Sequence, residues 1–251
     1  MKLRVLTHNV FITANARPAA WREHARALLA VVREHDVAIA CLQEVPRRLA
    51  ALVARECSTH VAVVRTGPWP EEALVALLRR DRVRGHRDVA MPVAAHDGQL
   101  ALLDLALRGT PVPLRLMHAH LDFYSRERRL RAADAIVSAI GSAPRHALLA
   151  CGDFNEPAAA DAIHGRLHAA GLRDAWDTPA GGAAGPRTRP GTFHGFKGLD
   201  GPSVHIDWVL ANDPLRAVSC DVVDHARLAF SDHVAVLAEF ELGDRGTRST
   251  P

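Results

Sequence analysis

The stretch HALLACGDFNEP, residues 146–157, joins an apolar run to a tight group of polar residues and decides the fold of this chain. Residues 147–151 are apolar enough for a buried strand, and Asp153 and Asn155 follow directly at its end. A carboxylate and a carboxamide are poor core material, because burying them without partners costs free energy. We therefore expect a buried strand whose end holds something charged.

Length and composition indicate a folded globular protein with a sizeable core. The 251 residues suit one large α/β domain, and we expect a single domain over residues 1–251 with a disordered tail over about 243–251. Hydrophobic residues make up 48% and charged residues 24%, and the net charge of +3 is too small to indicate nucleic-acid binding by charge alone. No apolar run is long enough for a membrane span, and no secretory signal is recognisable. The four cysteines form no CxxC pair, which favours a reduced, cytoplasmic protein, and we expect a monomer.

Short apolar runs alternate irregularly with a few helical patterns. Helical spacing predicts helices over residues 18–35, 46–57 and 158–170, and one that begins after an N-cap at Ser125. Strand-like runs cover residues 3–10, 36–45, 60–65, 72–78, 99–107, 112–121, 146–154, 203–211, 217–223 and 234–242. This order is neither a regular βαβ alternation nor all-β. It predicts the α/β class, with two mixed sheets packed face to face and helices outside, and the Pro/Gly-rich residues 178–201 as a long active-site loop.

Polar side chains repeatedly close the apolar runs. They are Asn9, Glu44, His120, Asp122, Asp153, Asn155, Asp207, Asp232 and His233. One such residue alone is usually a turn or cap residue. Asp207 is harder to explain in that way, because a carboxylate between apolar neighbours needs a histidine or a metal as a partner. Carboxylate and amide oxygens with histidines, and no cysteine ligand, favour Mg²⁺ or Mn²⁺ and are typical of phosphoester hydrolysis.

Seven motifs in a fixed order carry a family resemblance. They are HNV at 8–10, LQEV at 42–45, HAHLDF at 118–123, GDFN at 152–155, TFHGF at 192–196, HIDWVL at 205–210 and SDH at 231–233. The ordered set resembles the endonuclease/exonuclease/phosphatase superfamily, which has the DNase I-like fold. The resemblance implies a four-layer α-β-β-α sandwich with the site at one end of the two sheets. It also implies a metal-dependent phosphoric ester hydrolase.

The resemblance further implies roles for the matching residues. Glu44 is the expected principal ligand of Mg²⁺ or Mn²⁺, with Asn9 and Asp232 beside the metal. Asp153 is expected to orient or deprotonate the attacking water, and Asn155 to donate to the phosphate or hold the nucleophile.

A second group of residues is expected at the phosphate and around the substrate. His233, paired with Asp207, and His120 are the expected phosphate contacts, with His233 as a donor or as general base. Substrate contacts are expected from Asp122, His194, Arg80 and Arg129, and a structural role beneath the site is also open for Arg129. The sequence departs from the family pattern at Phe123, where a histidine is common, and at Glu72, where a glycine is common.

The substrate class rests on weaker features. Aromatic residues make up only 5%, and the basic cluster at 125–131 suits a solvated helix face at least as well as a nucleic-acid track. We therefore expect a phosphorylated small-molecule or lipid substrate, reached without a membrane span. A nuclease acting on DNA or RNA, including an abasic-site endonuclease, is the alternative. A binding or scaffold role on a dead hydrolase ranks below both, because no catalytic position is lost.

Overall fold

The computed structural model of this chain describes residues 1–11, 18–66, 72–90, 98–160, 162–178, 188–197, 203–223 and 225–243. Apart from Gly243, the tail expected to be disordered lies outside these residues. The same holds for residues 179–187 and 198–201 of the expected active-site loop.

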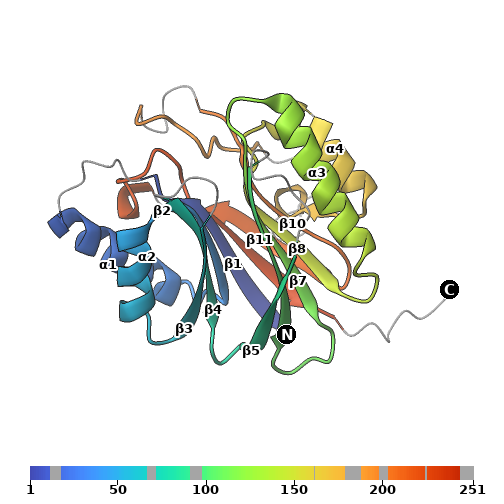
Figure 1. The fold of residues 1–251 in the computed structure, drawn as a ribbon, viewed down its shortest axis with the longest axis horizontal. Helices are drawn as coiled ribbons and strands as arrows, with labels where there is room; N and C mark the ends of the chain where they lie inside the picture. The colour runs from blue at the N-terminus through green and yellow to red at the C-terminus, as the bar shows by residue number, and fades with distance from the viewer. Residues whose placement is uncertain are drawn as a thin grey trace.

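Two six-stranded mixed sheets face each other across a common core (Figure 1). The first has the strand order β11-β12-β1-β2-β4-β3, and the second has the order β5-β6-β7-β8-β10-β9. The first sheet comprises β1 (Lys2–Asn9), β2 (Ile39–Pro46), β3 (His60–Thr66), β4 (Glu72–Arg79), β11 (Leu215–Val222) and β12 (Val236–Leu242). The second comprises β5 (Val83–Val89), β6 (Gly98–Leu107), β7 (Leu114–Leu121), β8 (Ala147–Asp153), β9 (Arg173–Asp174) and β10 (Asp207–Ala211).

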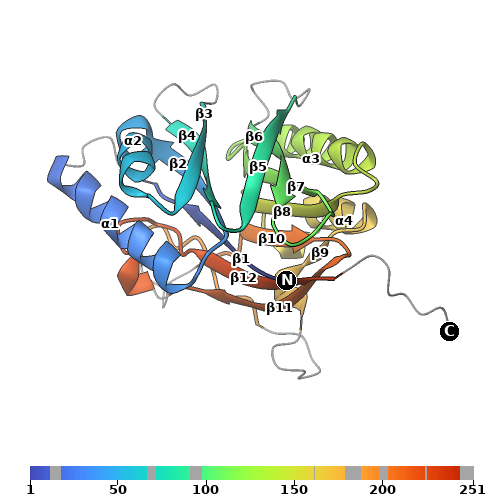
Figure 2. The same cartoon turned by 90° about the horizontal axis from the view of Figure 1, so that it is seen from below.

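Helices cover the outer face of each sheet, so the molecule has four layers (Figure 2). The four α-helices are α1 (Pro18–Glu34), α2 (Arg47–Glu56), α3 (Arg126–Gly141) and α4 (Ala162–Ala169). Short 3₁₀ turns occupy Ala158–Ala160, Ala175–Asp177 and His225–Arg227. The predicted α-β-β-α sandwich with the DNase I-like arrangement is confirmed. Within the described ranges, none of the helices combines the length and the apolar character that crossing a membrane requires.

Three apolar clusters hold the layers together, because alternate residues of each strand face opposite sides. One cluster lies between the sheets and includes Val5, Leu116 and Leu149. A second packs α1 and α2 against the first sheet, and the third packs α3 and α4 against the second sheet. Central strands such as β8 are therefore buried on both faces.

The short strand β9 was not predicted, and two further regions differ from the sequence prediction. β5 was not predicted, since its sequence VRGHRDV is polar and most of its side chains are exposed. It forms because an edge strand can pair with one neighbour, β6, without burying a full face. The helix predicted over 158–170 is divided into the 3₁₀ turn Ala158–Ala160 and α4.

Strand direction brings the polar strand ends to one edge of the sandwich. β1 and β2 are parallel, as are β7 and β8, so each pair ends at the same side. His120 lies beside Asp153 in register, and Asp207 opens the antiparallel β10 opposite Asp153. Residues far apart in the sequence therefore meet at this edge.

Candidate active site

Asp153 lies at the centre of the site because of the backbone around it. Gly152 has φ +145°, and a Cβ at this position would lie 1.8 Å from the carbonyl oxygen of Ala119, so only glycine lets β8 approach β7 this closely. Asn155 has φ +50°, a left-handed conformation that asparagine tolerates. Its main-chain N–H donates to Asp153 Oδ1 at 2.8 Å. The turn thus leaves Asp153 Oδ2 facing the cavity, which explains the spacing of the two polar residues.

Glu44 and Asn9 come from the neighbouring ends of β2 and β1. The pairing of β2 with β4 is irregular between Leu42 and Val45, and Glu44 has φ +50° within this bulge. The Asn9 amide donates to Glu44 Oε1 at 2.9 Å and to Asp153 Oδ2 at 3.0 Å. The Asn9 Oδ1 accepts from the Phe11 main-chain N–H. Asn9 therefore orients two carboxylates here through its amide nitrogen, and its place beside a metal stays a prediction.

His233 and Asp207 form the pair expected from the sequence. The Nδ1–H of His233 donates to Asp207 Oδ2 at 2.9 Å, and both side chains are buried. This leaves the other ring nitrogen, Nε2, 3.7 Å from Asp153 Oδ2 and 4.0 Å from Asp232 Oδ1. The aspartate thereby fixes which imidazole nitrogen faces the cavity.

Two side-chain hydroxyls hold the main chain of this pair in place, and neither of them was predicted from the sequence. The Ser231 hydroxyl donates to the Asn9 carbonyl at 2.6 Å and accepts from the His233 N–H at 3.0 Å. The Thr192 hydroxyl accepts from the Asp207 N–H at 3.1 Å. Both residues belong to motifs already singled out, since Ser231 is the serine of SDH and Thr192 the threonine of TFHGF, and this membership was the signal that could have found them.

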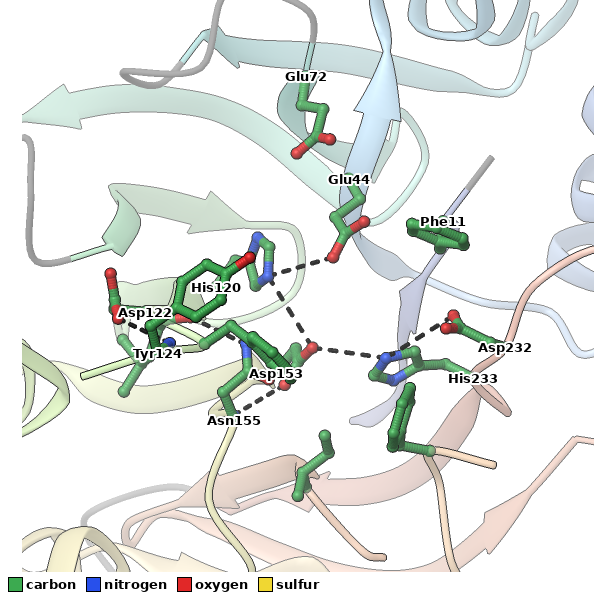
Figure 3. A pocket seen from close by; sticks show the side chains of 14 residues that line it. Phe11, Glu44, Glu72, His120, Asp122, Tyr124, Asp153, Asn155, Asp232 and His233 are labelled. Carbon is green, nitrogen blue, oxygen red and sulfur yellow. Dashed lines mark hydrogen bonds and ion pairs between the residues drawn. The ribbon is translucent and has the colours of Figure 1, made fainter. Parts of the chain in front are cut away.

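A cavity of about 380 Å³ opens over these residues (Figure 3). His120 enters it from the end of β7, with Nε2 3.4 Å from Glu44 Oε1 and 4.0 Å from Asp153 Oδ2. Its described lining is Phe11, Glu44, Glu72, His120, Leu121, Asp122, Phe123, Tyr124, Asp153, Asn155, Phe193, Ile206, Asp232 and His233. Asn155 is held at the wall by its amide, which donates to the Leu121 carbonyl at 2.9 Å. Seven of the predicted site residues therefore line one cavity, and Asn9 and Asp207 support it from behind.

Burial and neighbouring charges shift the acid–base groups in opposite directions. Burial, together with the nearby Asp207, raises the pKa of Asp153 to about 6, although His233, His120 and Asn9 oppose the shift. Burial alone would lower the pKa of His233, but Asp207, Asp153 and Asp232 raise that pKa to about 10. Near neutral pH the site therefore presents a carboxylate beside an imidazolium.

The donor set fits a hard divalent cation. Glu44 and Asp232 offer carboxylate oxygens at the cavity wall, and burial and the charge of Glu44 raise the pKa of Asp232, although His233 opposes this. Asp232 Oδ1 is buried and accepts no hydrogen bond from the described residues. Asp153, Asp207 and His233 also lie within metal-binding distance of one another. Because His233 is already hydrogen-bonded to Asp207, the carboxylate oxygens still available to a cation are those of Glu44 and Asp232.

Two predicted substrate contacts do not reach the cavity. Arg80 follows β4 at the end opposite Glu72, where its Nε donates to the Ser58 carbonyl, so the predicted contact is wrong. The strand was predicted at nearly the same residues. Its eight residues, however, place Glu72 at one edge of the sheet and Arg80 beyond the opposite edge. His194 is buried, with its ring perpendicular to Phe196, and is absent from the described lining.

Arg129 and Asp122 have structural contacts. The Arg129 guanidinium pairs with the buried Glu156 at 3.2 Å and donates to the carbonyls of Asp122 and Phe123. Arg129 thus ties the loop after β7 to the loop after β8 beneath the site, which is the structural role that the sequence left open for it. The Asp122 carboxylate accepts from the N–H groups of Tyr124 and Ser125 before α3. Burial would raise the pKa of Asp122, but these bonds and Arg128 lower it.

The sequence matches the Endonuclease/Exonuclease/phosphatase family over residues 6–233. The chain belongs to this family. Members of the family are phosphoester hydrolases, so the predicted enzyme class is supported in its general form. A search among curated proteins finds no match.

Solved structures agree with this family assignment at the level of the fold. A family member from Bacteroides vulgatus shares 19% identity at a TM-score of 0.79, covering 97% of this chain and all of that one. A humanized Danio rerio TDP2 shares 18% sequence identity at a TM-score of 0.74, covering 96% of this chain and 99% of that one. A mannosyl-6-phosphatase from Bacteroides thetaiotaomicron shares 16% sequence identity at a TM-score of 0.75, covering 95% of this chain and 99% of that one.

Proposed function

We propose that this protein is a divalent-metal-dependent phosphoester hydrolase that acts on a small-molecule or lipid-derived phosphoester through an activated water. The observation that carries the proposal is the convergence of Asp153, His120 and the His233–Asp207 pair in one cavity beside Glu44 and Asp232. Neighbours with this fold include TDP2 and a mannosyl-6-phosphatase, which supports phosphoester chemistry without selecting the ester.

The residues divide the reaction between a base and a donor. Asp153, ionised above a pKa of about 6, is placed to orient an attacking water and take its proton. The imidazolium of His233 turns its free Nε2–H to the cavity and would donate to a phosphoryl oxygen. His120 and Asn155 line the same wall as further polar contacts. Glu44 and Asp232 would hold Mg²⁺ or Mn²⁺, which supplies positive charge at the phosphate oxygens.

The proposal is tested by hydrolysis of a substrate panel with Mg²⁺ or Mn²⁺ and with EDTA. The panel holds phosphomonoesters, aryl phosphodiesters, phospholipids, single-stranded DNA and abasic-site DNA. We expect turnover that EDTA stops and added metal restores. Preferred cleavage of the nucleic acids would instead support the nuclease alternative.

Replacing the base gives a residue-level check of the mechanism. Asp153→Asn is expected to lower kcat about 10²- to 10⁴-fold, because the amide cannot accept the proton. Asp134→Asn, on the exposed surface of α3, is the matched control and should retain wild-type activity. Near-normal turnover by Asp153→Asn would remove this residue from the mechanism.

A further inference from the structure

The cavity contains more negative charge than the proposed chemistry requires. Its described lining includes five carboxylates, those of Glu44, Glu72, Asp122, Asp153 and Asp232. Arg128 pairs with Asp122 from outside the lining, and no lysine or arginine is present among the described lining residues. A phosphomonoester carries nearly two negative charges near neutral pH, whereas a phosphodiester carries one. The surplus charge therefore opposes a monoester more strongly than a diester.

Glu72 is the carboxylate with no place in the proposed mechanism. It opens β4, in register with Pro46, so it lies at the same edge of the first sheet as Glu44. Its side chain points into the cavity toward Glu44 (Figure 3). Glu72 therefore adds a negative charge at the cavity mouth.

Aromatic side chains form two walls at the same mouth. On one side, the rings of Phe123 and Tyr124 are perpendicular, with centroids 5.1 Å apart, and the residues are 63% and 90% exposed. On the other, Phe11 packs against Phe196, which is 55% exposed, with centroids 5.9 Å apart. In Figure 3, Tyr124 and Phe11 lie on opposite sides of Glu44 and Asp153.

These walls account for most of the exposed large hydrophobic residues in the described part of the chain. Those residues are Val64, Phe123, Tyr124, Phe196 and Val204, and the three aromatic ones all adjoin the cavity. Phe196 also has φ +60°, an unfavourable conformation for a bulky side chain. Exposed apolar groups concentrated in this way are typical of a ligand surface.

We infer that the cavity selects a phosphodiester with an aromatic substituent over a phosphomonoester, through the charge of Glu72 and the aromatic walls. The inference rests on the hydrolase function proposed above. Water oxygen forms a new bond to phosphorus, its proton passes to Asp153, and the bond to one ester oxygen breaks. The leaving oxide takes a proton from His233 or solvent, which gives an alcohol or phenol and a phosphomonoester. Glu72 then repels the doubly charged product, which favours its release.

The test compares bis(4-nitrophenyl) phosphate with 4-nitrophenyl phosphate, which release the same chromophore. We expect kcat/KM to be higher for the diester. Glu72→Gln should raise kcat/KM on the order of tenfold for the doubly charged monoester and by a smaller factor for the singly charged diester. Phe123→Ala and Tyr124→Ala should each raise KM for the diester about three- to tenfold. The controls are Glu56→Gln on α2 and Val64→Ala on β3, which lie outside the cavity lining. They should leave kcat/KM and KM unchanged for both substrates.

A binding measurement separates this inference from the proposed function. Calorimetry of the wild type with Ca²⁺ should show tighter binding of diphenyl phosphate than of phenyl phosphate. In Glu72→Gln the ratio of the two dissociation constants should be closer to one. A faster monoester, tighter phenyl phosphate binding, or an equal loss on both esters in Glu72→Gln would overturn the inference. Absence of turnover across the whole substrate panel would instead contradict the hydrolase, and the calorimetry would still decide the selectivity.

Discussion

At the scale of single residues, the site depends on pairs in which one side chain sets the state of another. Asp207 contributes no atom to the described cavity lining, yet it holds His233 by a 2.9 Å hydrogen bond and helps raise the pKa of His233 to about 10. The Asp207 pKa is lowered in return, because the charge and hydrogen bond of His233 outweigh the effect of burial. The two residues therefore work as a positioning residue and a catalytic residue of one unit.

A double-mutant cycle tests this unit. With Asp207→Asn and His233→Ala, either single change should lower kcat/KM nearly as much as both together, because members of a catalytic unit are non-additive. ¹⁵N NMR of the metal-free wild type should show His233 protonated at pH 8, and Asp207→Asn should lower its pKa. Additive losses in kcat/KM, or an unchanged His233 pKa in Asp207→Asn, would show that the residues act separately.

At the scale of elements, a buried polar layer lies between the apolar core and the site. His118 on β7 faces Gln43 on β2 at 2.8 Å, and Gln43 also bonds to Thr7 on β1. Burial and the neighbouring His120 lower the pKa of His118 to about 3. His118 is therefore neutral in the folded protein, with Nε2 as the acceptor for the Gln43 amide.

This layer predicts a pH dependence of stability. The folded pKa of about 3 is below the ordinary 6.5, so the unfolded chain binds the proton first as pH falls. Stability is full above pH 6.5 and declines toward pH 3, by up to about 1.4 kcal/mol per pH unit from this group. Urea unfolding at pH 7.5, 6 and 5 should show a shallower decline in His118→Gln than in the wild type. The exposed His86→Gln on β5 is the control, and equal slopes in all three proteins would exclude His118 as the cause.

At the scale of the whole molecule, the site exists only when both sheets have formed and docked. Asn9 and Glu44 come from the first sheet, and His120, Asp153 and Asp207 from the second. The hydrogen bond from Asn9 to Asp153 spans the two sheets. A cation held at this junction would bind the folded state and not the unfolded chain, so binding should stabilise the fold.

Thermal unfolding measures this coupling without any substrate. Mg²⁺ or Mn²⁺ at about a hundred times its Kd should raise Tm of the wild type by about 5 °C or more. Glu44→Gln should lose most of that increase and bind the metal weakly in calorimetry, whereas Glu56→Gln should keep it. An equal rise in Glu44→Gln would show that the ligand assignment is wrong. The single domain and the monomer stay predictions, which the same unfolding curve and a sedimentation measurement would check.

Sequence alone determined the buried strands and the polar residues that end them, because apolar alternation and turn chemistry are local properties of the chain. HALLACGDFNEP shows this directly, since its strand and its Asx turn depend on neighbouring residues. Only the tertiary structure decided which polar residues meet, because strand direction and register set distances between segments far apart in the chain. Glu72 opens β4 and Arg80 follows its end, yet the tertiary structure places Arg80 away from the cavity and Glu72 inside it. The aromatic walls have the same origin: Phe11, Tyr124 and Phe196 follow no common sequence pattern, and the docking of the two sheets gathers them around one site.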